Sequence, residues 1–381
     1  MRNIDFSDEF PLDPTLIYLN HAAIAPWPRR TARVIQDFAE ENMSQGARAY
    51  PDWLATEARV REQCRALLNA PAAEDIAFLK NTSEALSVVA HGLAWQPGDN
   101  IVISDQEFPS NRIVWQSLRE LGVETRQAAL GHGTSPEQAL AACMDSRTRL
   151  LAISSVHFAS GLRLDLERLG KLCRARAILF CIDAIQSLGA LPLDVQACQA
   201  DFVMADGHKW LLSPEGCALF YVRPEVREEL QLRQYGWHMV ESQDDFSNQD
   251  WKVAASARRF ECGSPNMLGI HALGSSLELL AEVGMDEVAS RVLSHSACLI
   301  DALGSLPDIE ILTPQQSGRY AGIVSFRHAQ VDSADLHAHL LARNVICAQR
   351  GEGVRFSPHF YTRQRQLDAA VEAVKEVTRS R

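Results

Sequence analysis

Short apolar runs, separated by longer stretches of mixed character, mark the first two thirds of the chain. The runs lie at residues 77–79, 101–103, 150–153, 177–182, 202–204 and 218–222. Because strands that are apolar at every position are buried on both faces, this pattern indicates a mainly parallel sheet with helices on each side. We therefore predict an α/β fold in which ligands bind at the carboxyl ends of the strands.

The rest of the chain predicts a second, smaller lobe of the α+β type. Ser264 followed by Pro265 is typical of a helix start, and apolar residues at helical spacing continue from there to Leu280. Strands are then predicted at 309–312, 322–326, 345–347 and 354–356, and helices at 332–343 and 364–377. We expect an N-terminal segment near the active site (residues 1–30), a large ligand-binding domain (31–281) and a small C-terminal domain (282–381).

Composition excludes several classes of partner. The 381 residues carry a net charge of −11 with scattered Lys and Arg, which argues against nucleic acid and anionic membranes. Residues 1–9 are acidic without an apolar signal, and no apolar run approaches the roughly 18 residues of a membrane span, so we expect a cytoplasmic location. The nine cysteines form no close pairs, so we expect neither a disulfide framework nor a metal site.

Two chemically distinctive residues follow neighbouring predicted strands. Asp183 ends the run 177–182, and Lys209 follows the run 202–204. A pyridoxal phosphate enzyme needs such a pair, the amine to form a Schiff base and the carboxylate to keep the pyridine nitrogen protonated. Apolar neighbours such as Trp210 exclude water from the amine, which lowers its pKa and favours imine chemistry. We therefore predict pyridoxal 5'-phosphate as the cofactor, rather than a helix-capping Asp183 and a surface Lys209.

The turn at residues 80–84 predicts an anion site. Thr82 and Ser83 lie where a strand leads into an amphipathic helix. A helix N-terminus with free N–H groups and hydroxyls suits the phosphate of the cofactor. The alternative is that both residues are ordinary helix caps.

Seven short motifs, spread from Tyr18 to the last predicted helix, occur in the same order as in a known family. They are YLNHAA (18–23), NTSEA (81–85), EFPSN (107–111), DAIQ (183–186), GHKW (207–210), FECGSPN (260–266) and RFSPHFY (355–361). Together they resemble the class V aminotransferase family. These fold-type I pyridoxal phosphate enzymes include cysteine desulfurases, selenocysteine lyases, kynureninases and isopenicillin N epimerase.

The resemblance implies a role for each matching residue. Lys209 is the implied Schiff-base lysine, Asp183 the partner of the pyridinium nitrogen, and Gln186 the group that bonds the phenolic oxygen. Phosphate contacts are implied for three residues of this chain, Thr82, Ser83 and His208, and for one residue of a neighbouring subunit, Ser264.

A homodimer and an amino acid substrate are also implied. Ser264 matches the position from which one subunit reaches the phosphate of the other. Arg355 matches the arginine that holds the substrate carboxylate, a task that suits the bidentate guanidinium fork.

Phe108 departs from the pattern of the desulfurases. These enzymes have a histidine after the motif glutamate, which stacks on the cofactor ring and moves protons. Phe108 can stack on the ring but carries no proton. The segment Phe108-Pro109-Ser110 is closer to that of the kynureninases.

Three further positions stay open at this stage. Cys347 falls near the persulfide cysteine of desulfurases, but it follows a predicted strand, where a cysteine is usually a small buried hydrophobe. Asp206 would repel a phosphate unless it turns toward a histidine or arginine. His157 is either a second base facing the substrate or a structural histidine.

We expect the chain to be an aminotransferase, with a cysteine or selenocysteine lyase as the first alternative. A kynureninase-like hydrolase and an epimerase are further alternatives. Loss of the proton-carrying histidine at position 108 places the lyase second. The substrate side chain and the pathway are not determined by these motifs.

Overall fold

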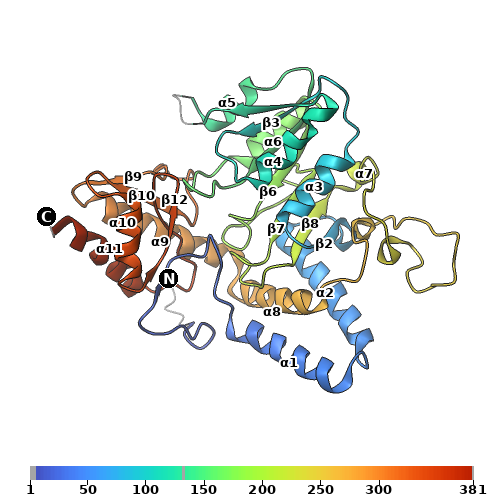
Figure 1. Cartoon of the computed structure of the whole chain (residues 1–381), viewed down its shortest axis with the longest axis horizontal. Coiled ribbons are helices and arrows are strands. Elements are labelled where there is room, and N and C mark those ends of the chain that lie inside the picture. The colour runs from blue at the N-terminus through green and yellow to red at the C-terminus, as the bar shows by residue number, and fades with distance from the viewer. Residues whose placement is uncertain (1–5, 131–133, 380–381) are drawn as a thin grey trace.

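The computed structural model describes residues 6–130 and 134–379. Residues 1–5 and 380–381, which belong to the predicted N-terminal segment and C-terminal domain, lie outside this range. In Figure 1 the C-terminal strands and helices (orange to red) gather on one side of the molecule, and the large sheet lies on the other. None of the described helices combines the length and apolar character that crossing a membrane requires.

A seven-stranded sheet forms the centre of the large lobe, in the order β2-β8-β7-β6-β5-β3-β4. Only β8 runs against the other strands, because it pairs antiparallel with both β2 and β7. The strands are β2 (Ile76–Leu79), β3 (Asn100–Ser104), β4 (Glu124–Ala128), β5 (Thr148–Ser154), β6 (Leu179–Asp183), β7 (Phe202–Asp206) and β8 (Ala218–Val222). The predicted α/β fold with a mainly parallel sheet is confirmed.

Helices cover both faces of this sheet, as the continuous apolar strands require. Ile101 and Ile103 belong to the same buried cluster as Leu86 of α3. Val102, whose side chain points the opposite way, packs in the cluster that contains Val60 of α2. Burial of each such side chain contributes roughly 1.5–3 kcal/mol to folding.

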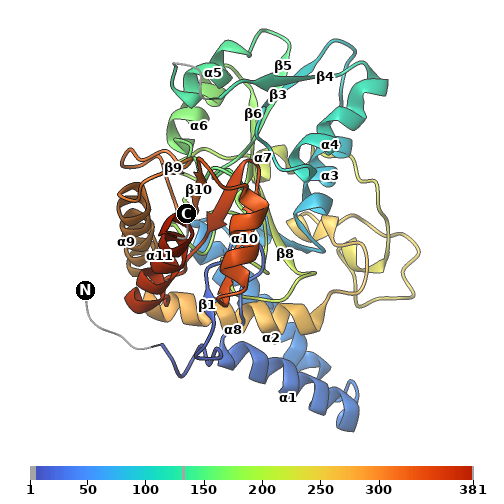
Figure 2. The ribbon, with the colours of Figure 1, turned by 60° about the vertical axis from the view of Figure 1, so that its left-hand side comes forward.

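Along the chain, most helices of the large lobe lie between consecutive strands. Helices α1 and α2 precede the first strand of the large sheet, and α8 follows the last one. The helices are α1 (Arg29–Gln45), α2 (Tyr50–Leu68), α3 (Thr82–Gly92), α4 (Ser110–Gln116), α5 (Pro136–Ala142), α6 (Leu166–Ala175), α7 (Pro224–Arg227) and α8 (Met267–Val283). Short 3₁₀ helices lie at Ala73–Asp75, Ser117–Leu121, Trp237–Met239 and Ala257–Phe260. Figure 2 shows α8 running beneath the sheet beside α1 and α2.

The C-terminal lobe is built on a four-stranded antiparallel sheet in the order β12-β13-β10-β9. Its strands are β9 (Ile309–Ile311), β10 (Val324–His328), β12 (Ala348–Arg350) and β13 (Gly353–Phe356), and its helices are α9 (Met285–Gly304), α10 (Ser333–Leu341) and α11 (Gln364–Arg379). A separate parallel pair joins β1 (Ile17–Tyr18) to β11 (Val345–Ile346). The N-terminal segment is therefore attached to the C-terminal lobe, and the predicted domain boundaries stay a prediction.

Several predicted element boundaries were wrong, and one strand of the large sheet was missed. The helix predicted from Ser264 begins at Met267, because the Asn266 side chain caps it by accepting from the Gly269 N–H at 3.0 Å. The strand predicted from Ala177 begins at Leu179, because Ala177 adopts a left-handed turn with φ 54°. The edge strand β4 was missed, since its sequence, ETRQA, is polar rather than continuously apolar and only its last residue is buried.

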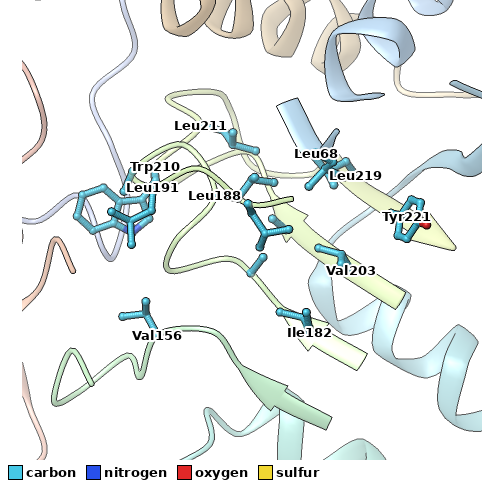
Figure 3. Close-up of a cluster of buried hydrophobic side chains, with 14 of the residues drawn as sticks. Leu68, Val156, Ile182, Leu188, Leu191, Val203, Trp210, Leu211, Leu219 and Tyr221 are labelled. Carbon is cyan, nitrogen blue, oxygen red and sulfur yellow. The ribbon is translucent and has the colours of Figure 1, made fainter. Parts of the chain in front are cut away.

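A buried apolar cluster lies beneath the segment that carries Lys209. Figure 3 shows Trp210 beside Leu191, with Leu188 and Leu211 continuing the cluster toward the strands. The loop that follows β6 approaches this segment so closely that a Cβ atom on Gly189 would lie 2.3 Å from the Trp210 carbonyl oxygen. Gly189 also has φ 95°, so no other residue fits there without strain.

Replacing Gly189 with alanine should destabilise the protein more than the same change at Gly318. Both glycines have positive φ, but nothing lies within 4 Å of a Cβ atom on Gly318. We expect Gly189→Ala to lower the free energy of unfolding by about 1–3 kcal/mol more than Gly318→Ala, because only the first change forces two backbone segments apart. Urea unfolding followed by circular dichroism measures the difference. Equal losses in the two variants would contradict the close packing of this loop.

Candidate active site

The carboxyl ends of adjacent parallel strands bring the predicted catalytic residues together. Asp183, the last residue of β6, lies opposite Ser154 of β5 on one side and Met204 of β7 on the other. Lys209 follows three residues after the end of β7. The site therefore lies where an open α/β sheet places its ligands.

Asp183 is buried, with 2% of its surface exposed. One carboxylate oxygen accepts a hydrogen bond from the Ile185 N–H at 3.1 Å. Burial raises the pKa of Asp183 to about 7, the nearby charge of Glu107 adds to the rise, and the charge of Lys209 opposes it. A carboxylate in this setting gains stability from a cationic partner.

Lys209 is also buried, and burial lowers the pKa of its amine to about 8. The charge of Asp183 opposes this change, and Arg355 adds to it. A substantial fraction of the amine is therefore neutral near physiological pH. Both an imine-forming nucleophile and a proton acceptor need this state.

Trp210 holds the segment of Lys209 in place from two directions. Its indole N–H donates to the Gln186 side-chain oxygen at 3.0 Å, and its carbonyl oxygen lies 3.0 Å from His359 Nε2. His359 is fully buried. The lysine backbone is thus fixed to β6 and to the C-terminal lobe.

Gln186 joins the N-terminal segment to this arrangement. Its amide nitrogen donates to the Ala22 carbonyl at 3.0 Å, which leaves one N–H of the amide free. The Ala25 N–H donates to the His208 carbonyl at 2.9 Å. The N-terminal segment therefore contacts Gln186 and His208, and contact of Gln186 with the phenolic oxygen of the cofactor stays a prediction.

The N-terminus of α3 offers donors for a phosphate. Asn81, rather than Thr82 or Ser83, caps the helix, because its side-chain oxygen accepts from the Glu84 N–H at 2.9 Å. The Thr82 hydroxyl is consequently left buried without a hydrogen-bond partner. Ser83 is exposed and its hydroxyl lies 2.8 Å from that of Ser110. A free buried hydroxyl at a helix N-terminus fits a bound phosphate.

His208 and Asp206 lie side by side next to Lys209. The His208 Nδ1 atom is 3.2 Å from an Asp206 carboxylate oxygen, although the alignment is not that of a hydrogen bond. The Asp206 carboxylate therefore points toward His208. In this orientation the negative charge of Asp206 is compatible with a phosphate nearby. The phosphate contact of His208 stays a prediction.

Phe108 lies next to the lysine. Its ring centre is 5.7 Å from Lys209 Nζ, and the ring makes an edge contact with Phe158. The side chain is 42% exposed, which is unusual for phenylalanine and leaves a face free for a flat ligand. Stacking of Phe108 on the cofactor ring stays a prediction.

Glu107 positions Phe108, a role that the sequence analysis did not assign. Its buried carboxylate accepts from the Ser154 N–H at 3.1 Å and from the Ser154, Ser104 and Asn111 side chains. The segment that carries Phe108 is thus fixed to the end of β5. The only sequence signal was the position of Glu107 within a family motif.

His157 proves to be bound within the protein. Its two ring nitrogens lie 3.1 Å from the Ser104 hydroxyl and 3.0 Å from the Gln106 side-chain oxygen. The ring is buried, and burial lowers its pKa. These contacts favour the structural alternative over a second base.

Arg355 is buried yet keeps most of its hydrogen-bonding capacity. One terminal nitrogen donates to the Phe158 carbonyl at 2.5 Å, while Nε and the other terminal nitrogen have no partner within the described ranges 6–130 and 134–379. Burial lowers the pKa of Arg355 to about 9, and the charge of Arg350 adds to this effect. Because an unpaired buried guanidinium is costly, this group is well prepared for a carboxylate from outside the chain.

Ser264 and Cys347 differ in accessibility. Ser264 is exposed, so its predicted contact with a neighbouring subunit is sterically open and stays a prediction. Cys347 is buried in the apolar core of the C-terminal lobe, and burial raises the pKa of its thiol to about 12. A reactive thiol needs a lower pKa and access to solvent, so Cys347 is a core residue.

A cluster of Glu57, His238 and Glu261 resembles a metal site in spacing, with ligand atoms within 4.8 Å of one another. Arg61 donates to both carboxylates, at 2.5 Å to Glu57 and 2.7 Å to Glu261. The guanidinium already supplies the positive charge that the carboxylates need. We therefore interpret this cluster as a buried ion-pair network.

Comparison with known proteins agrees with this geometry. The family model described as Aminotransferase class-V matches residues 17–371. The chain therefore belongs to the class V aminotransferase family, whose enzymes use pyridoxal phosphate. The predicted family, enzyme class and cofactor are confirmed.

Several individual proteins are similar over most of their length. A probable cysteine desulfurase of Methanothermobacter thermautotrophicus is 28% identical, covering 99% of this chain and 98% of the relative. A cysteine desulfurase of Klebsiella pneumoniae is 30% identical, covering 85% of this chain and 81% of the relative. A solved structure of a C-DES mutant, with glycine covalently linked to its PLP cofactor, has a TM-score of 0.90 at 21% identity and covers 97% of this chain and 99% of that one. This last similarity confirms the fold.

The lowered pKa of Lys209 can be tested in cofactor-free protein. Acetylation of Lys209 by acetic anhydride should have a midpoint near pH 8, and the exposed Lys171 serves as a control for the reagent. In Asp183→Asn the midpoint should move to lower pH, because the negative charge that favours the protonated amine is gone. Peptide mass spectrometry measures both curves. A midpoint near the ordinary value of 10.5, or an upward shift in Asp183→Asn, would refute the proposed electrostatics.

Proposed function

We propose that this enzyme uses pyridoxal phosphate to cleave the carbon–sulfur bond of cysteine or a cysteine derivative. The single observation that carries the proposal is a buried amine, Lys209, that interacts electrostatically with both Asp183 and Arg355, a guanidinium with two unpartnered nitrogens among the described residues. Amino acid chemistry needs an amine, a counter-ion for the cofactor ring and a carboxylate-binding group, and all three are present. The names of the relatives support sulfur chemistry.

The described residues fit the cofactor. Thr82 and the α3 N-terminus would hold its phosphate, Asp183 its ring nitrogen, and Phe108 one face of its ring. When bound, pyridoxal phosphate supplies an electron sink that acidifies the Cα–H bond of the substrate. The unpartnered hydroxyl of Thr82 and the exposed face of Phe108 are the structural observations behind this fit.

Arg355 binds the substrate carboxylate, and Lys209 accepts the substrate proton. Arg355 has two unpartnered nitrogens to bind the substrate carboxylate, and this orients the Cα–H bond. The free amine of Lys209 accepts the Cα proton, for which a pKa near 8 is well suited. Burial around both groups excludes water from the transfer.

The surroundings of Lys209 favour elimination over transfer of sulfur to an enzyme thiol. Cys347 is buried with a raised pKa, so it is a poor sulfur acceptor. Phe108 carries no proton, which leaves Lys209 as the proton carrier next to the substrate. After Lys209 takes the Cα proton, the Cβ–S bond breaks, the sulfur leaves with the electron pair, and this proton returns to it. Water then converts the three-carbon remainder to pyruvate and ammonia.

Aminotransferase, the first expectation from the motifs, is here the second candidate. The sequence analysis placed the lyase second because position 108 carries no histidine. The relatives support the lyase instead, since both are cysteine desulfurases by name and neither is an aminotransferase. An elimination needs only one mobile proton, so the phenylalanine at this position does not exclude it.

The products distinguish these routes. Holoenzyme incubated with cysteine or cystine should release pyruvate and ammonia in equal amounts. Cys347→Ala should keep this activity, whereas Lys209→Ala should lose it together with the visible absorbance of the cofactor. Coupled lactate dehydrogenase and ammonia assays measure the products. Alanine as the main product would show sulfur transfer, and a pyridoxamine form with a keto acid would show transamination; either result would disprove the elimination.

A homodimer is part of the same proposal. Ser264 is exposed, and four exposed aromatic side chains lie on the nearby segment 235–251. These are Tyr235, Trp237, Phe246 and Trp251. Apolar patches of this kind mark interaction sites.

Replacing the most exposed of these residues should weaken the dimer. Phe246 is 83% exposed in the single chain, so Phe246→Asp places a charge on the surface without disturbing the core. Sedimentation velocity should show a dimer for the wild type and more monomer for the variant. Leu341→Asp, at an exposed position of the C-terminal lobe, is the matched control. A monomeric wild type with full activity would rule out the dimer.

A further inference from the structure

Arg350 and Arg355 project from the same face of one hairpin. Strands β12 and β13 pair antiparallel, with Ala348 opposite Arg355 and Arg350 opposite Gly353. Side chains alternate between the two faces of a strand, so Arg350 shares a face with Ala348, and therefore with Arg355. The two guanidinium groups occupy diagonal positions, which long side chains bridge readily.

Arg350 has no carboxylate partner in the described part of the chain. One of its terminal nitrogens donates to the neighbouring Gln349 carbonyl at 2.8 Å. The acidic residue of the turn, Glu352, is engaged elsewhere, because its carboxylate pairs with Arg327 at 2.6 Å. The hairpin therefore presents an exposed cation that its own acidic residue does not neutralise.

The free charge of Arg350 acts on the active site. It lowers the pKa of Arg355 and also that of Lys209. Arg350 is therefore within electrostatic reach of the place where a substrate bound to Arg355 would lie. Arg350 and Arg355 lie on one face of the hairpin, and neither has a carboxylate partner among the described residues. The two cations therefore repel each other until anions bind.

We propose that Arg350 is a specificity-determining residue that binds a second anionic group at the far end of the substrate. The substrate class is then a cysteine whose sulfur carries a substituent with a carboxylate, of which cystine and S-carboxymethylcysteine are examples. This inference rests on the proposed function, which places the α-carboxylate on Arg355 and the scissile sulfur near Lys209.

The difference in burial between Arg355 and Arg350 determines which group of the substrate each one can bind. Arg355 is 1% exposed and can receive only a group that enters the site, whereas Arg350, on the same face of the hairpin, is exposed. An α-carboxylate on Arg355 leaves the charge of Arg350 uncompensated. A second carboxylate on the substituent compensates it through charge-assisted hydrogen bonds.

A pair of substrates that differ only in charge tests the inference. We expect wild-type holoenzyme to cleave S-carboxymethylcysteine with a kcat/KM about tenfold above that of the neutral S-carbamoylmethylcysteine. Arg350→Gln should abolish this preference, so that the charged and the neutral substrate are cleaved with equal kcat/KM. Arg350→Lys should restore part of the preference, because the charge returns without the planar fork. Arg365→Gln, which removes an exposed arginine from α11, is the matched control and should keep it.

A binding measurement separates this inference from the proposed function. Calorimetry on Lys209→Ala loaded with pyridoxal phosphate reports binding of both compounds without turnover. Tighter binding of the charged compound, lost in Lys209→Ala/Arg350→Gln, supports the role of Arg350 even if no carbon–sulfur cleavage is found. Equal binding of the two compounds, or a preference that survives Arg350→Gln, refutes it whatever the reaction.

Discussion

The burial of an amine next to a carboxylate at the ends of two parallel strands is the constraint on which the rest of this structure depends. Lys209 and Asp183 each lose hydration, and burial shifts the pKa of each toward neutrality. Such a pair is expensive to maintain, since desolvation costs several kcal/mol per ion. The surrounding packing therefore has to fix the positions of the two groups. The chain belongs to a family that uses pyridoxal phosphate, and this cofactor is a ligand that interacts with both groups.

Hydrogen bonds made by the neighbours of Lys209 hold its segment in position. Trp210 connects the lysine segment to Gln186 of the large lobe and to His359 of the C-terminal lobe. Glu107 fixes the neighbouring aromatic ring to β5. These supports use buried polar groups that are engaged in hydrogen bonds. By contrast, Thr82 and Arg355, two of the residues that would touch a ligand, keep buried polar atoms without a hydrogen-bond partner among the described residues.

Much of this organisation follows from local sequence. Continuous apolar runs predicted the parallel sheet, and their polar ends predicted Asp183 and Lys209. The polar edge strand β4 was missed because burial on one side only leaves no continuous run. The role of Glu107 was also missed, since its contact with Ser154 joins residues 47 positions apart, which only the fold brings together. The ranking of aminotransferase before lyase rested on the single position 108, which does not determine the reaction type by itself.

The attachment of β1 to the C-terminal lobe has a consequence for the order of folding. His21 contacts Ser357 across a separation of 336 residues, and Ile17 pairs with Val345. The segment that supplies Ala22 to Gln186 is thus synthesised long before its partners in the C-terminal lobe, yet it can reach its place only after those strands exist. Contacts of such high sequence separation form late and slowly. The large sheet can assemble during synthesis, but the active site is completed only once the whole chain is available.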